Sequence, residues 1–126
     1  MSNAIRMIDP IKTPPISMAT VYNGLVYVAG QVGFKPGTTE VAGADIKSQC
    51  RQTMANVDAV LKAAGTSKDR LIRCNVYLTQ VERDFGALNE CYTQWLGDHK
   101  PARSTVGVAL ALPQLLVEID CIAALP

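Results

Sequence analysis

The sequence predicts a two-layer α+β domain in which two helices cover one face of a mixed six-stranded sheet. Several short segments carry apolar residues at every second position, as strands do, and two longer segments carry them at every third or fourth position, as helices do. The chain has 126 residues, enough to bury a core of its own, and we expect a single domain over residues 1–126.

The amino-terminal part of the chain favours strands. Residues 5–9 suit a short strand, and the apolar runs 18–22 and 25–30 suit two more. Asn23 and Gly24 separate the last two runs. This pair favours a type I′ turn, because both of its positions need a positive φ, so a hairpin is predicted here.

Two segments have the periodicity of helices. Residues 45–65 bring their apolar side chains to one face, with Asp45 suited to cap the amino end and Gly65 suited to follow the carboxyl end. Residues 83–98 show a similar stripe rich in aromatics, which are expected to fill the core. The turn-rich segment 31–43 is expected to be a loop.

The remaining alternating segments predict three strands. Residues 70–78 suit a half-buried strand, and 103–110 and 115–124 suit two more, joined by a short link as a hairpin. If their most apolar sides face the helices, the other residues share the opposite face: Arg103, Thr105, Gly107, Glu118, Asp120 and Ile122. Because no helix covers that face, we expect the chain to associate with copies of itself.

Composition argues against several functions. The net charge is +1 without a basic run, so nucleic-acid binding is not expected. No apolar run approaches the ~18 residues of a membrane span, and residues 1–15 lack a targeting pattern, so we expect a cytoplasmic protein that does not bind membranes. His99 is the single histidine, and the four cysteines lack C-x-x-C spacing, so no metal site is predicted.

Three positions are the candidates for chemistry. Arg103 offers a planar fork that binds a carboxylate or phosphate, or it forms a structural ion pair with Glu118 or Asp120. Glu118 lies between two apolar residues, and burial would raise its pKa toward the range useful for acid–base catalysis; alternatively it faces solvent. Gly30 follows a strand and would let the backbone approach a ligand.

These residues lie within motifs that resemble the YjgF/RidA family, also called L-PSP or reactive-intermediate deaminases. The motifs are "VYVAGQVGF", "NVDAVLKAAG", "NVYLT", "NECYTQWLGDHKPARSTVGVALALP" and "VEIDCIA", and the similarity covers about residues 16–124. The resemblance implies a chorismate-mutase-like fold and homotrimers with ligand clefts between subunits. It also implies hydrolysis of enamines and imines to keto acids and ammonia, without a metal or cofactor.

The resemblance also implies roles for individual residues. Arg103 matches the arginine that holds the substrate carboxylate, and Glu118 matches the glutamate that orients or activates water. Gly30 matches a backbone contact near the ligand, and Asn89 matches an asparagine near the cleft. Thr105 stands where many members have cysteine.

Two positions depart from the family pattern. Ile16 stands where many members have tyrosine, and Ala29 where many have serine, so one end of the expected cleft is more apolar. The leading hypothesis is an enamine/imine deaminase acting on a small carboxylate substrate. The alternatives are a binding module for carboxylate metabolites without catalysis, and a ribonuclease or translation inhibitor, which the composition supports poorly.

Overall fold

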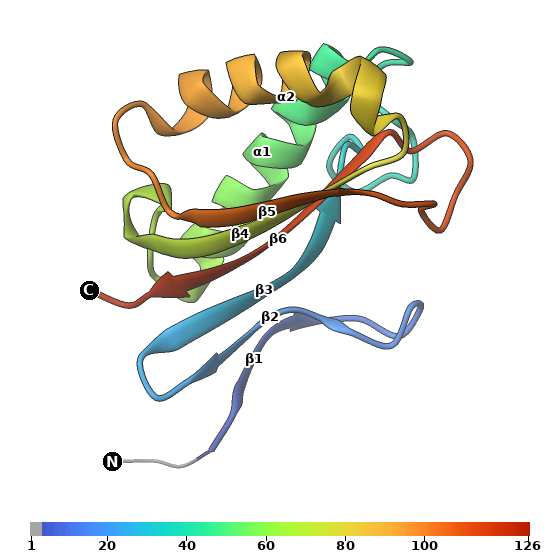
Figure 1. The fold of residues 1–126 in the computed structure, drawn as a ribbon. Helices are drawn as coiled ribbons and strands as arrows, with labels where there is room; N and C mark the ends of the chain where they lie inside the picture. Colours follow the sequence, from blue (N-terminus) through green and yellow to red (C-terminus); the bar gives the residue numbers. More distant parts are fainter. Residues whose placement is uncertain (1–3) are drawn as a thin grey trace.

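The computed structural model describes residues 4–126 and has two helices packed on one face of a six-stranded sheet (Figure 1). The elements are, in chain order, β1 (Arg6–Pro10), β2 (Ser17–Tyr22), β3 (Leu25–Val32), α1 (Ile46–Ala64), the 3-10 helix η1 (Lys68–Arg70), β4 (Leu71–Leu78), α2 (Val81–Leu96), β5 (Ala102–Gly107) and β6 (Val117–Ala124). The strand order is β1-β2-β3-β6-β4-β5, and only β4 and β5 run parallel. The predicted fold class is confirmed.

Local sequence signals act where they were predicted. Asn23 and Gly24 have φ values of 54° and 80° in the turn between β2 and β3, so the predicted hairpin is confirmed. The Asp45 carboxylate accepts a hydrogen bond from the Ser48 amide at 2.9 Å and caps α1. Gly65 has a φ of 91° just after the last residue of α1, a conformation that favours glycine.

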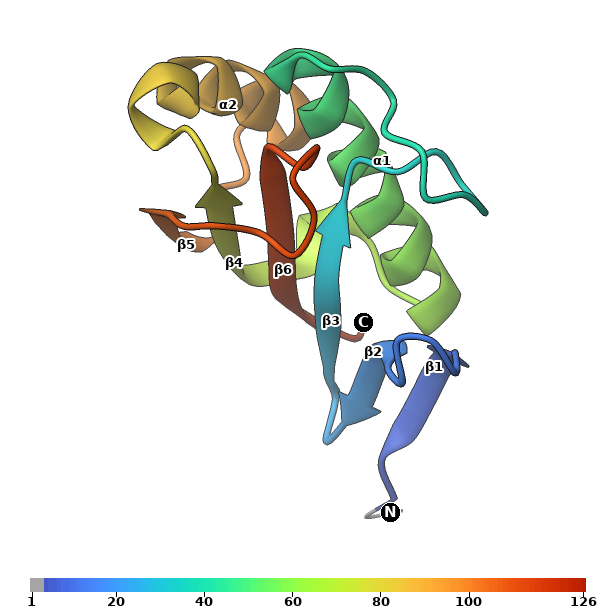
Figure 2. The same ribbon diagram turned by 90° about the vertical axis from the view of Figure 1, so that its right-hand side faces the viewer.

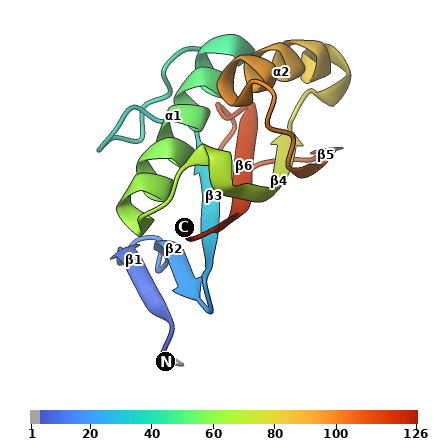
Figure 3. The same ribbon diagram turned by 90° about the vertical axis from the view of Figure 1, so that its left-hand side faces the viewer.

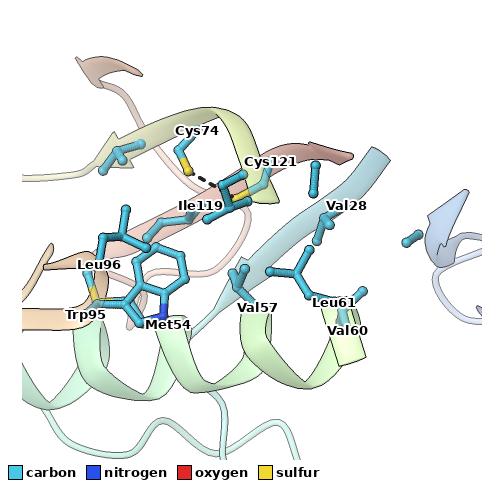
Figure 4. Packing of buried hydrophobic residues seen from close by; sticks show 14 of the residues in the cluster. Val28, Met54, Val57, Val60, Leu61, Cys74, Trp95, Leu96, Ile119 and Cys121 are labelled. Atoms are coloured by element: carbon cyan, nitrogen blue, oxygen red, sulfur yellow. Dashed lines mark hydrogen bonds between the residues drawn. The ribbon is translucent and has the colours of Figure 1, made fainter. Parts of the chain in front are cut away.

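The core lies between the helices and the sheet. In β6 every second residue is buried, which places one face of this central strand against α1. Figure 4 shows buried side chains of the two helices and the sheet meeting in this layer, where the Sγ atoms of Cys74 and Cys121 lie 3.5 Å apart as free thiols. The Trp95 indole donates to the Asp58 carboxylate at 3.0 Å, which connects α2 to α1.

The predicted hairpin between the last two strands is wrong, because β4 lies between β5 and β6 (Figure 2). The connection from β4 to β5 contains α2, and a helical crossover of this kind joins parallel strands. β5 therefore lies at one edge of the sheet and β1 at the other (Figure 3). Alternation within a strand does not identify its neighbour, so the sequence could not decide between the two arrangements.

The pairing of β5 with β4 also corrects the predicted face of Arg103 and Thr105. Arg103 lies opposite Cys74 in register, and Cys74 is fully buried beneath the helices. Arg103 and Thr105 therefore face α2, whereas Glu118 and Asp120 lie on the open face as predicted. Correspondingly, Val106 is 46% exposed rather than part of the core.

Candidate functional site

Arg103 lies in a cluster of polar and aromatic side chains between β5 and α2. Its Nη2 donates to Asn89 Oδ1 at 2.7 Å. The guanidinium carbon lies 4.7 Å from the centre of the Tyr92 ring and 5.9 Å from that of Phe85, distances typical of cation–π contacts. These contacts hold a half-buried arginine whose remaining N–H groups can bind an anion.

No described carboxylate forms an ion pair with Arg103. The structural pair with Glu118 or Asp120, which the sequence left open, is therefore absent within residues 4–126 of one chain. A half-buried cation without a counterion attracts anionic ligands, because the protein lowers the local dielectric constant around it. The cluster is suited to a carboxylate.

Gly30 and Glu118 meet on the open face. The pairing of β3 with β6 shifts between Val28 and Gln31, and this irregularity contains Gly30. A Cβ atom at Gly30 would lie 2.8 Å from Glu118 Cδ, so only glycine leaves room for the carboxylate in its present position. The absence of a side chain at Gly30 thus allows the Glu118 side chain to occupy its position.

The surroundings of the Glu118 carboxyl favour its protonated form. Burial raises its pKa, and the neighbouring Asp120 carboxylate raises it further. Asp120 itself accepts hydrogen bonds from Asn75 Nδ2 and from the Tyr77 hydroxyl, each at 2.8 Å. Because both oxygens of Asp120 have donors, Glu118 is the freer of the two acids to act on a ligand.

A hollow of about 610 Å³ lies on the β1–β2–β3 part of the open face. It brings together Ile16 and Ala29, the two positions that depart from the family pattern. Ala29 directly precedes Gly30 in β3, but neither Gly30 nor Glu118 lines the hollow. The full lining is Ile5, Met7, Ile16, Ser17, Thr20, Tyr27, Val28 and Ala29.

The site residues form two sets that one chain does not bring together. Arg103, Thr105 and Asn89 lie on the helix-covered face at the β5 edge. Gly30 and Glu118 lie on the open face, and Ile16 lines the hollow there. With β4 between β5 and β6, the two strands are about 10 Å apart, at ~4.8 Å per strand. A small ligand therefore cannot contact Arg103 and Glu118 of the same chain.

Sequence reasoning named Asn89 but missed other partners of the candidate residues. Phe85 and Tyr92 lie four residues before and three residues after Asn89 on α2, a spacing that puts all three on one helix face. The sequence therefore contained a signal for the two aromatic partners of Arg103. Nothing in the sequence pointed to the bonds of Asn75 and Tyr77 with Asp120, because they depend on the register of β4 with β6.

Comparison with known proteins identifies the family. The sequence profile described as Endoribonuclease L-PSP matches residues 9–125. The chain belongs to this L-PSP family, also called YjgF/RidA. A RutC family protein of Pyrococcus horikoshii is 39% identical over 109 residues, which cover 86% of each chain. The crystal structure of RidA from an Antarctic Psychrobacter superposes with a TM-score of 0.84 at 35% identity, covering 92% of this chain and 93% of that one.

Other L-PSP relatives bear on location. A Schizosaccharomyces pombe relative named "Protein mmf1, mitochondrial" is 37% identical over 90% of this chain and 74% of its own length. The cytoplasmic location of the present protein stays a prediction. No helix within residues 4–126 has the length and apolar character needed to span a membrane. In the same residues, no three His, Cys, Asp or Glu side chains are grouped to hold a metal ion.

Proposed function

We propose that the protein hydrolyses reactive enamines and imines to keto acids and ammonia, as a homotrimer with its active sites between subunits. The proposal rests on one observation, which is that the site residues of one chain are divided between the two faces of the sheet. Arg103 and Glu118 face away from each other in one chain, yet both have the features of ligand-binding groups. A cleft between subunits joins the Arg103 cluster of one copy to the Glu118 carboxylate of the next.

The two sets of residues supply complementary chemistry. Arg103 binds the substrate carboxylate with two N–H groups and fixes the orientation of the C=N bond. Ionised Glu118 takes a proton from water as the oxygen attacks the C=N carbon and passes it to the nitrogen, which gives a neutral carbinolamine. Glu118 then takes the proton of the carbinolamine hydroxyl and gives it to the nitrogen, so that the C–N bond breaks as the C=O bond forms, and ammonia and the keto acid leave. A carboxyl with a raised pKa suits both steps, and one such group contributes about 10²–10⁴-fold.

An ammonia-release assay with imino acids generated in situ tests the proposal. Arg103→Ala is expected to lower kcat/KM by about 10- to 100-fold, the effect of losing charge-assisted hydrogen bonds to a carboxylate. The control is Arg51→Ala, which removes an exposed arginine of α1 and should leave the rate unchanged. A wild-type rate equal to the protein-free rate would contradict catalysis, and an unchanged Arg103→Ala rate would contradict the carboxylate role.

A second candidate function is a binding module for carboxylate metabolites. It is favoured by the Glu118 carboxylate, for which no described residue supplies a hydrogen bond that would orient it. Calorimetry with 2-keto acids separates the two functions when run beside the ammonia assay. Saturable binding without ammonia release from any imine would support the module and refute the enzyme.

The family's description as an endoribonuclease suggests a third function. Two observations argue against it. The net charge of +1 offers little attraction for RNA, and the aromatic rings of Phe85 and Tyr92 contact Arg103 in the cluster assigned to the substrate carboxylate. RNA cleavage that survives stringent purification and is lost in Glu118→Gln would favour this function over the deaminase.

A further inference from the structure

We propose that Tyr92 is a positioning residue for Arg103, whose ring holds the guanidinium in place of a counterion and so keeps the cation available to the substrate carboxylate. The inference deepens the proposed function and rests on it, because the position of Arg103 matters only if Arg103 binds a carboxylate. It gives separate roles to the two parts of the side chain. The ring contacts Arg103, whereas the hydroxyl has no hydrogen-bond partner among the described residues.

The Tyr92 ring stabilises the charge of Arg103 without using its donors. A carboxylate partner would neutralise Arg103 and occupy its N–H groups, in competition with the substrate, and no described carboxylate does so. Instead the guanidinium carbon lies over the Tyr92 ring, 4.7 Å from its centre. The face of an aromatic ring attracts a cation through its quadrupole. The N–H groups that do not bond Asn89 therefore stay open to a ligand.

The Tyr92 ring is itself held by a buried neighbour. The rings of Tyr92 and Trp95 meet edge to face, with their centroids 5.9 Å apart and their planes inclined by 73°. Trp95 is buried, and its indole donates to the Asp58 carboxylate of α1 at 3.0 Å. A fixed ring restricts the guanidinium that lies over it, so less side-chain entropy is lost when a carboxylate binds. The contacts therefore run from α1 through Trp95 and Tyr92 to Arg103.

The Tyr92 hydroxyl adds nothing to this arrangement. It is buried without a hydrogen-bond partner in residues 4–126, and the nearby thiol of Cys74 is a weak acceptor that is not in hydrogen-bonding geometry. Burial raises the pKa of Tyr92, so the side chain stays neutral and acts on Arg103 through its ring rather than as a phenolate. A buried hydroxyl without a partner is destabilising, so phenylalanine here should keep the ring contact and improve stability.

Calorimetry with pyruvate and with pyruvamide, which carries a carboxamide instead of the carboxylate, tests the inference without requiring turnover. The Kd of pyruvamide divided by that of pyruvate measures how strongly the protein selects a carboxylate. Tyr92→Leu removes the ring and keeps an apolar side chain. We expect it to lower this ratio by about 2- to 30-fold, the range of a cation–π contact. Tyr92→Phe should leave the ratio unchanged and raise the midpoint of thermal unfolding.

Two controls separate positioning from loss of stability. In an Arg103→Ala background, Tyr92→Leu should not lower the ratio further, because the ring acts through Arg103. Val60→Ala trims a buried residue of α1 that has neither a ring nor a polar group to offer Arg103. It should lower the midpoint of unfolding, as a cavity in the core does, and leave the ratio unchanged.

The outcomes distinguish this inference from the proposed function. A high ratio in the parent protein that Tyr92→Leu leaves unchanged overturns the role of Tyr92, while carboxylate binding by Arg103 stands. A ratio that falls in Tyr92→Phe, or falls further in the Arg103→Ala background, also overturns it. A ratio near one in the parent protein contradicts carboxylate binding and this inference with it. If no imine yields ammonia but Tyr92→Leu lowers the ratio, the deaminase is refuted and the role of Tyr92 is supported.

Discussion

Replacing Gly30 with alanine is expected to impair catalysis while leaving the fold intact. The added methyl group would lie 2.8 Å from Glu118 Cδ and closer still to Oε2. The obstacle is the end of a flexible side chain rather than backbone, so Glu118 moves and the sheet does not. Gly30 also lies outside the left-handed region, so alanine meets no backbone strain there.

The expected loss follows from the displacement of the carboxylate. An ordinary contact begins at 3.4 Å, so Glu118 Cδ must retreat by at least about 0.6 Å from its 2.8 Å position, and the oxygen by more. A misplacement of ~1 Å costs about 100-fold in an oriented reaction. We therefore expect kcat/KM to fall roughly 10- to 100-fold, with KM for the substrate carboxylate less affected because Arg103 is untouched.

Ammonia release at several imine concentrations measures this loss, and thermal unfolding measures stability. Gly86→Ala is the matched control, because a Cβ atom at Gly86 in α2 meets nothing within 4 Å. It should retain full activity and gain up to about 1 kcal/mol in stability, as a helix does when glycine becomes alanine. Full activity in Gly30→Ala would refute the role assigned to the Glu118 position.

Three further predictions concern proton transfer, polar packing and the thiols. Activity should rise with pH as Glu118 ionises, at a pH set by its raised pKa. Asp120→Asn removes the adjacent negative charge and should move this rise to lower pH. An unmoved pH profile would show that the two carboxyls do not interact. Gln49→Ala should lower the free energy of unfolding in urea by about 3 kcal/mol, because this fully buried amide bonds three backbone groups; a loss below ~1 kcal/mol would contradict this. The four cysteines, among them Cys74 and Cys121, are all buried, so a thiol reagent should label them only in denaturant, and rapid labelling of the native protein would be inconsistent with that burial.

Sequence reasoning succeeded where structure depends on neighbours in the chain. The turn at Asn23 and Gly24 and the ends of α1 at Asp45 and Gly65 are set by local hydrogen bonds and φ preferences. The order of elements followed from the same local periodicities. These features needed no knowledge of which strands pair.

The errors came from pairing between distant segments. The strand containing Arg103 alternates as expected, but its partner is β4 rather than β6, and this places Arg103 beneath α2. A shift of one residue in the register of a strand turns every side chain to the opposite face of the sheet. Residues 103–110 carry apolar side chains in both alternating sets, so their pattern does not decide which set faces the helices. The meeting of Gly30 with Glu118 likewise depends on the irregular pairing of β3 with β6.

Mixing two impaired variants tests the account's central claim, a site shared between subunits. Arg103→Ala and Glu118→Gln each disable every cleft of their own homotrimer. In trimers assembled at random from equal amounts of both, about one cleft in four joins an intact Arg103 to an intact Glu118. At each cleft, the chance of an intact Arg103 from one subunit is one half, and so is the chance of an intact Glu118 from the next. The account therefore predicts recovery of about a quarter of wild-type ammonia release. If both residues of one chain served the same site, the mixture would show only the residual activity of the two single variants.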